Sequence, residues 1–199
     1  MNHSYLLHID AFEKQRYQPK MLINFVLLIV LSIIAGTITP FTTDLAAPFK
    51  EQGFSQEQID NMMTFMPIVT GVSVLLGCLL NSLIYFIIIL IVAKIARSDA
   101  SAKSIWSSTL LMLVILTVVT VITMLIQWMF GLQLPDINIA SLNIFSPGQP
   151  QLGAINLQNI LTSWLLGVVL YSTCHLAKKW SIILAVIHFV IVFSFSFFG

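Results

Sequence analysis

Five long apolar stretches, separated by short charged ones, limit most strongly how this chain can fold. They cover about 21–40, 67–93, 105–130, 160–177 and 180–198. A helix needs about 20 consecutive apolar residues to cross the hydrocarbon core of a bilayer, and in lipid each backbone amide must be satisfied within its segment. Transmembrane strands would alternate apolar and polar residues, whereas these stretches are continuously apolar. We therefore predict an all-α membrane protein with five transmembrane helices in one bundle.

Composition agrees with lipid as the main solvent. Charged residues make up 9% of the chain and hydrophobic residues 58%, whereas a typical soluble domain is roughly 25% charged. The net charge of +1 leaves no basic stripe to neutralise phosphates, so nucleic acid is not expected as a partner. The expected partners are the lipid bilayer and other membrane proteins, or further copies of this chain in a homo-oligomer.

Basic residues set the predicted orientation of the five spans. If the five spans alternate in direction, Lys50 falls on one side of the membrane and the other eight Lys and Arg residues fall on the opposite side. Cytoplasmic loops carry the excess of Lys and Arg, so the N-terminus is predicted in the cytoplasm and the C-terminus outside. The eight residues on the cytoplasmic side are Lys14, Arg16, Lys20, Lys94, Arg97, Lys103, Lys178 and Lys179.

A four-span alternative treats 160–198 as one helix. It would place Lys178 and Lys179 near the bilayer centre, at a cost of about 2.5–3.5 kcal/mol for each lysine on the insertion scale. A turn at the "KKW" sequence avoids this cost. We therefore predict a cytoplasmic hairpin there, with His175 just inside the membrane beside it.

The segments outside the spans give weaker predictions. Residues 1–20 form a cytoplasmic segment, read either as an interfacial helix carrying Leu6, Ile9 and Phe12 or as a disordered tail. Residues 21–199 form the membrane domain. Ser55 followed by Gln58 has the form of a capping box, which predicts that a helix begins near residue 56.

The second outer segment, 131–159, contains the sequence "INIASLNIF". Its apolar and polar residues alternate as in a strand. A lone strand would leave its edges unpaired, so we expect this segment to fold against the outer ends of the spans.

Two polar patterns inside the spans are candidate helix-packing or path residues. Ser73, Gly77 and Asn81 recur every fourth residue and form a small-residue face that permits close helix approach. In the third span, a polar stripe consists of Thr117, Thr120, Thr123 and Gln127. Packing is the preferred interpretation of both patterns, because threonine hydroxyls can bond to their own helix.

His188 is the deeply placed residue that can titrate near neutral pH. An embedded histidine suggests a functional site, although a neutral imidazole also serves as a hydrogen-bond partner between helices. We keep both interpretations open.

Residues that would indicate an enzyme are missing from the spans. No Asp, Glu, Lys or Arg lies within the core of any span, and no metalloprotease, hydrolase or phosphate-loop motif occurs. Cys78 and Cys174 are too few for a disulfide framework or a metal site and are expected to be buried small hydrophobes. We therefore expect no catalytic residues, no cofactor and no metal.

The sequence "INLQNILTSWLLGVVLYSTCHLAKKWSIILAV" resembles the last spans of bacterial Yip1-domain membrane proteins. The "GFSQEQIDNM" segment before the second span is similar to the family's short outer helix, and Ile160 stands where members often carry phenylalanine. The resemblance implies five spans, a cytoplasmic N-terminus and location in a bacterial cell membrane. The matching positions are Asn156, Ile160, Trp164, Gly167, Lys178 and Lys179.

The resemblance implies little about the function of this chain. Eukaryotic Yip1-domain proteins resemble trafficking factors that engage Rab-type GTPases, a machinery that bacteria lack. The leading hypothesis is a non-enzymatic scaffold or partner-binding factor in membrane organisation or transport. The alternative is a small permease or transporter subunit that moves a lipid, peptide or ion along the threonine stripe near His188.

Overall fold

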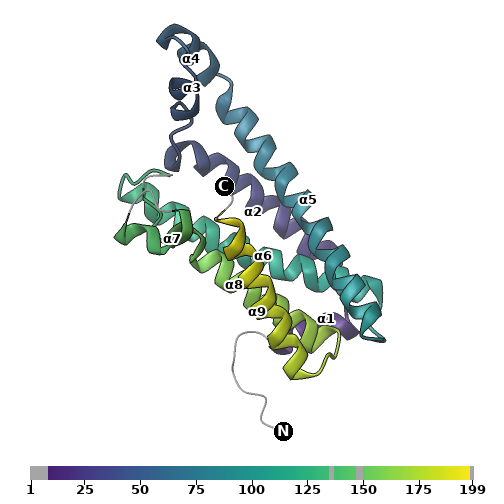
Figure 1. The fold of residues 1–199 in the computed structure, drawn as a ribbon. Coiled ribbons are helices and arrows are strands. Elements are labelled where there is room, and N and C mark those ends of the chain that lie inside the picture. Colours follow the sequence, from purple (N-terminus) through teal and green to yellow (C-terminus); the bar gives the residue numbers. More distant parts are fainter. Residues whose placement is uncertain (1–8, 135–136, 147–149, 198–199) are drawn as a thin grey trace.

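The chain is described by a computed structural model covering residues 9–134, 137–146 and 150–197. These residues are mostly helical and contain no β-strand (Figure 1). The predicted residue Leu6 and the end of the fifth predicted span at Phe198 lie outside the described residues. The elements are α1 Ile9–Tyr17, α2 Met21–Thr42, α3 Ala47–Glu51, α4 Gln56–Met63, α5 Met66–Ile95, α6 Ala102–Met129, the 3-10 helix η1 Leu142–Phe145, α7 Pro150–Ala154, α8 Leu157–Val168, the π-helix η2 Val169–Thr173 and α9 Lys178–Phe195.

Within the described residues, four helices are long and apolar enough to cross a membrane: α2, α5, α6 and α9. They correspond to four of the five predicted spans. The longest, α5, has 30 residues and is about 45 Å long at 1.5 Å per residue. It therefore exceeds a hydrocarbon core of about 30 Å and must tilt or extend beyond it.

The fourth predicted span, 160–177, differs from the other four. It consists of α8, with 12 residues, followed directly by the five residues of η2. The helical backbone stops at Thr173, because Cys174 begins a turn in which His175 adopts a φ of 53°. Most side chains of the two elements are buried. This segment is thus shorter and more enclosed than predicted.

The break after η2 excludes a single helix over 160–198. The turn comprises Cys174–Ala177, whereas Lys178, Lys179 and Trp180 already form the first turn of α9. The prediction of a turn at "KKW" was therefore about four residues too late. Helices α8 and α9 pack antiparallel, since a Cβ on Gly167 would lie 3.0 Å from Cβ of Ala185, while the earlier Ser163 on α8 bonds the later His188 on α9.

Successive long helices run in alternating directions. Asn24 near the start of α2 donates a hydrogen bond to the Ser107 carbonyl near the start of α6, and Ala35 packs with Val121 further along both helices. Helices α2 and α6 are therefore parallel. The intervening α5 returns between them and contacts α2 at Gly36.

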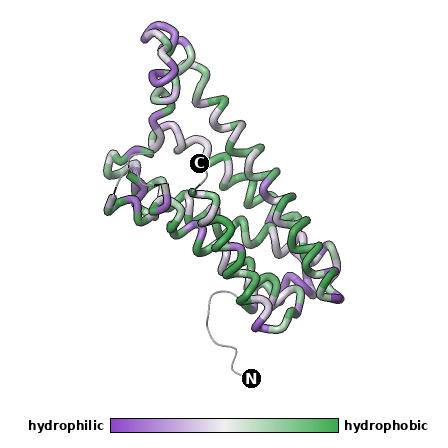
Figure 2. Tube along the Cα trace, in the orientation of Figure 1, coloured by the Kyte–Doolittle hydropathy of each residue, from purple (hydrophilic) through white to green (hydrophobic). Residues whose placement is uncertain are grey.

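Helix α6 lies at the centre of the bundle. Its most apolar 18-residue window is 39% buried, whereas the corresponding windows of α5 and α9 are 11% and 6% buried. Hydrophobic residues cover the long helices and hydrophilic ones gather toward their ends (Figure 2). The exposed apolar surfaces of α5 and α9 are suited to lipid or to another membrane protein.

The connecting segments bear out two predictions and refine a third. Ser55 and Gln58 form the predicted capping box, and α4 begins at Gln56. The "INIASLNIF" segment forms no strand; it contains η1 and a single bridge from Ser141 to Asn156. It folds against the end of a long helix, because the amide of Gln127 near the end of α6 donates to the Ile137 carbonyl.

Helix α1 packs onto the bundle. Phe12 is fully buried, and α1 contacts α6 and η2. This apolar side chain is thus covered by protein, and lipid has no access to it.

Candidate functional site

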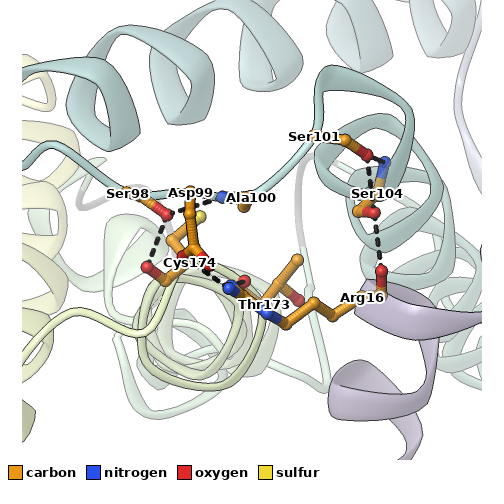
Figure 3. A network of polar contacts seen from close by, with 8 residues as sticks. All are labelled: Arg16, Ser98, Asp99, Ala100, Ser101, Ser104, Thr173 and Cys174. Carbon is orange, nitrogen blue, oxygen red and sulfur yellow. Dashed lines mark hydrogen bonds and ion pairs between the residues drawn. The ribbon is translucent and has the colours of Figure 1, made fainter.

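Three connectors that carry basic residues meet at one end of the bundle. We call this region the basic end and define it as residues 14–20, 94–103 and 174–179. Their meeting follows from hydrogen bonds that join α1, the α5–α6 connector and the end of η2 (Figure 3). The clustering predicted from the charge pattern is present in three dimensions.

Arg16 on α1 bonds both the end of η2 and the α5–α6 connector. Its guanidinium donates one hydrogen bond to the Thr173 carbonyl and another to the Asp99 carboxylate, both at 2.5 Å. The Arg16 side chain is only 9% exposed, whereas Asp99 is 83% exposed. Because the last carbonyls of a helix carry partial negative charge, Arg16 caps the end of η2.

The Arg16 guanidinium lowers the pKa of the Asp99 carboxyl through its hydrogen bond and its charge. A carboxyl whose pKa is lowered by folding stabilises the fold above its ordinary pKa and loses that contribution as the pH falls through the lowered value. The Asp99 side chain is largely exposed to solvent, so this contribution is small.

Serine hydroxyls connect the rest of the basic end. Ser98 donates to the Cys174 carbonyl at 2.6 Å, and Ser104 donates to the Arg16 carbonyl at 2.8 Å. Deeper in the bundle, Ser108 and Thr173 share a hydrogen bond of 2.8 Å. The network satisfies the backbone carbonyls where the helices end, as buried polar groups require.

The two non-glycine residues with positive φ among the described residues both lie at this end. They are Arg97, with φ 55°, and His175, with φ 53°. Each follows the end of a helix. The Ser98 N–H donates to the Ala93 carbonyl and the Arg97 N–H to the Lys94 carbonyl, which is the Schellman arrangement that usually takes glycine. Non-glycine residues in this conformation carry backbone strain.

A cavity of about 590 Å³ opens between these two strained caps. It lies between the end of α5, the start of α9 and the two connectors that contain Arg97 and His175. Sequence reasoning did not identify this cavity. The available signal was that Arg97 and His175 each stand two residues after the end of a helix.

His188 joins three helices. Its Nδ1 lies 2.8 Å from the Ser163 hydroxyl on α8, and its Nε2 lies 3.2 Å from the Tyr85 hydroxyl on α5. The Ser163 hydroxyl also donates to the Asn159 carbonyl at 2.9 Å. With the single hydroxyl proton of Ser163 on the Asn159 carbonyl, Nδ1 of a neutral His188 donates to Ser163, and Nε2 accepts from Tyr85.

This hydrogen-bonding pattern has a chemical consequence. A histidine that activates a serine must offer that hydroxyl a lone pair, whereas Nδ1 here offers a proton. The Ser163–His188 pair is therefore arranged as a link between helices and not as a nucleophile with its base.

The remaining predicted residues divide into outward and inward groups. Ser73, Gly77 and Asn81 all point out of the bundle from α5. No atom outside its own helix would lie within 4 Å of a Cβ on Gly77. The small-residue face thus does not pack against any other part of the described chain.

The predicted polar stripe of α6 lies mostly against its own helix. Thr117 and Thr120 donate to the carbonyls of Leu113 and Leu116, and Thr123 is partly buried. Gln127 is buried, and its amide donates to the Ile137 carbonyl. Within the described residues, no hydrogen bond connects this stripe to His188.

Close packing uses glycines that the sequence reasoning did not select for this role. A Cβ on Gly36 would lie 3.0 Å from Cα of Gly71, so α2 and α5 approach backbone to backbone. A Cβ on Gly167 would lie 3.0 Å from Cβ of Ala185 and 3.2 Å from the Ser181 carbonyl oxygen, both on α9. Of the two cysteines, Cys174 is buried as predicted, while Cys78 is only half-buried; both are free.

Comparisons with models of known families, with curated proteins and with solved structures found no match to this chain.

Proposed function

We propose that this chain is a five-span, Yip1-like protein of the bacterial cell membrane that acts as a non-enzymatic scaffold. Its N-terminus and basic end lie in the cytoplasm and its C-terminus lies outside. It binds another membrane protein, or a second copy of itself, through Ser73, Gly77 and Asn81, which we call the α5 face.

The alternating helix directions support five crossings. In this arrangement α8 and η2 return the chain to the basic end, and α9 leaves it again. Seventeen residues are at the lower limit of the length needed to cross a bilayer, and this segment is largely buried by protein. Local thinning of the bilayer accommodates a short helix at modest cost.

Asn81 is the observation that carries the proposed binding role. It lies midway along α5, its side chain is exposed, and within the described residues it has no hydrogen-bond partner. A carboxamide left unpaired in hydrocarbon is costly. A partner helix could satisfy it, since Ser73 and Gly77 on the same face leave room for close approach.

The polar groups inside the bundle favour this scaffold over a permease. The hydroxyls of Thr117 and Thr120 and the amide of Gln127 already donate to backbone carbonyls. His188 is engaged by α5 and α8. These groups are consequently used in holding the fold together, which leaves fewer of them to line an aqueous path.

Purification in mild detergent tests the proposal. The wild-type protein is expected to retain a stoichiometric partner or to form a homo-oligomer. Asn81→Leu should weaken that association roughly 5- to 30-fold, because an interhelical hydrogen bond in a membrane contributes about 1–2 kcal/mol in model peptides. Asn81→Gln, which keeps the amide, is the matched control. A wild-type protein that is monomeric and without partner contradicts the proposal.

A further inference from the structure

The cavity at the basic end has an apolar wall and a polar rim. Val92 and Ile95 from α5 and Leu184 from α9 supply apolar lining, while Arg97, His175 and Trp180 supply polar or amphipathic groups. Tryptophan at such a position is typical of the membrane–water interface. A ligand that fits both parts must itself be amphipathic.

The lining of the cavity extends from the two connectors to Val92 on α5 and Leu184 on α9. About two to three helical turns further in, the hydrogen bond between Tyr85 and His188 joins α5 to α9. Between this bond and the basic end, residues of both helices line the cavity. An acyl chain can therefore enter between α5 and α9 while its headgroup stays at the rim.

The charges at the rim select the headgroup. Asp99, the acidic residue of the lining, is paired with Arg16. In the part of the chain that the structure describes, no carboxylate forms an ion pair with Arg97. Lys178 and Lys179 follow the rim directly, in the first turn of α9. The rim thus has an excess of positive charge.

The backbone adds to this preference. The first turn of α9 has no side-chain cap at Ala177, which itself lines the cavity. Unpaired N–H groups at the start of an 18-residue helix favour an anion.

We propose that this cavity binds one anionic phospholipid, with its phosphate between Arg97 and the start of α9 and an acyl chain against Val92, Ile95 and Leu184. Basic sites between transmembrane helices on the cytoplasmic side recognise such headgroups. The inference rests on the proposed function only for the placement of the basic end at a membrane surface, and it does not require a partner on the α5 face.

Native mass spectrometry of the full chain in mild detergent tests the site with two lipids, phosphatidylglycerol and phosphatidylcholine. The wild-type protein should retain one phosphatidylglycerol in clear preference to phosphatidylcholine. Arg97→Gln should weaken phosphatidylglycerol binding about fivefold, the effect expected for one basic residue near an anionic surface. Lys103→Gln is the matched control, because Lys103 is an exposed cation at the same end that does not line the cavity.

A second variant distinguishes loss of the Arg97 charge from a folding defect caused by the substitution. Arg97→Gly removes the same charge and suits the left-handed backbone, so it should lose the lipid while remaining folded. Equal binding of the two lipids, or equal losses in Arg97→Gln and Lys103→Gln, would overturn the proposal. Displacement of the lipid by millimolar inorganic phosphate would also overturn it and indicate a site for free phosphate. If a partner is recovered through the α5 face but the protein binds the two lipids equally, the lipid site is wrong and the proposed scaffold function is unaffected.

Discussion

Gly36→Leu is expected to destabilise the protein by about 3 kcal/mol, at the upper end of the usual cost of overpacking. A Cβ at this position would lie 3.0 Å from Cα of Gly71 and 3.3 Å from its carbonyl oxygen. Both obstacles are backbone atoms, which cannot rotate away as a flexible side chain can. Helices α2 and α5 would have to separate, and the contact that holds α5 to the bundle would weaken.

The partner glycine of the same contact provides the control. A Cβ on Gly71 would meet no atom within 4 Å, so Gly71→Ala should be neutral or slightly stabilising, since alanine favours a helix by about 1 kcal/mol over glycine. Gly77→Leu should likewise leave the stability of the isolated chain unchanged. Thermal or denaturant unfolding in one mild detergent compares the variants, and equal stability of Gly36→Leu and the wild type would refute this account of the α2–α5 contact.

Arg16→Met should also cost substantially, about 1.5–3 kcal/mol, the usual range for a hydrogen bond that involves a charged group. Methionine keeps much of the apolar volume but leaves the Thr173 carbonyl at the end of η2 without its charged donor. Helix α1 and η2 would then lose one of their links. Faster hydrogen exchange of the amides in α1 and η2, together with lower unfolding stability, would show the effect.

Asp99→Asn tests the ion pair between Arg16 and Asp99 separately from the hydrogen bond between Arg16 and the Thr173 carbonyl. The Asp99 side chain is 83% exposed, and exposed ion pairs contribute little to stability. This variant should therefore be much milder than Arg16→Met and should leave exchange in η2 nearly unchanged. If Asp99→Asn were as damaging as Arg16→Met, the ion pair and not the helix cap would be the dominant interaction.

The sequence predicted the features that depend on local pattern. The long apolar stretches mark α2, α5, α6 and α9, because the length and polarity of a helix in lipid are dictated by the bilayer. The capping box at Ser55 identifies the start of α4. The run of cationic connectors likewise indicated that three distant segments share one end.

Other features depend on three-dimensional contacts that a single sequence does not encode visibly. Nothing local marks Arg16 as a helix cap for η2, which lies 157 residues away. The π-helix of η2 shortened the fourth predicted span, since it ends the helix four residues before the apolar run ends. Ser73, Gly77 and Gly36 are all small residues in apolar helices, and only the packing distinguishes the inward-facing glycine from the outward-facing pair.

The placement of the hairpin turn between η2 and α9 tests the five-crossing topology most directly. In a background lacking Cys78 and Cys174, single cysteines at Lys103, Lys179, Gln52 and Phe145 would be labelled in intact cells with a membrane-impermeant maleimide. Cysteines at Gln52 and Phe145 are predicted to react from outside, while those at Lys103 and Lys179 should react only after the cells are opened. Labelling of Lys179→Cys from outside, like Phe145→Cys and unlike Lys103→Cys, would contradict the passage of α8 and η2 across the membrane.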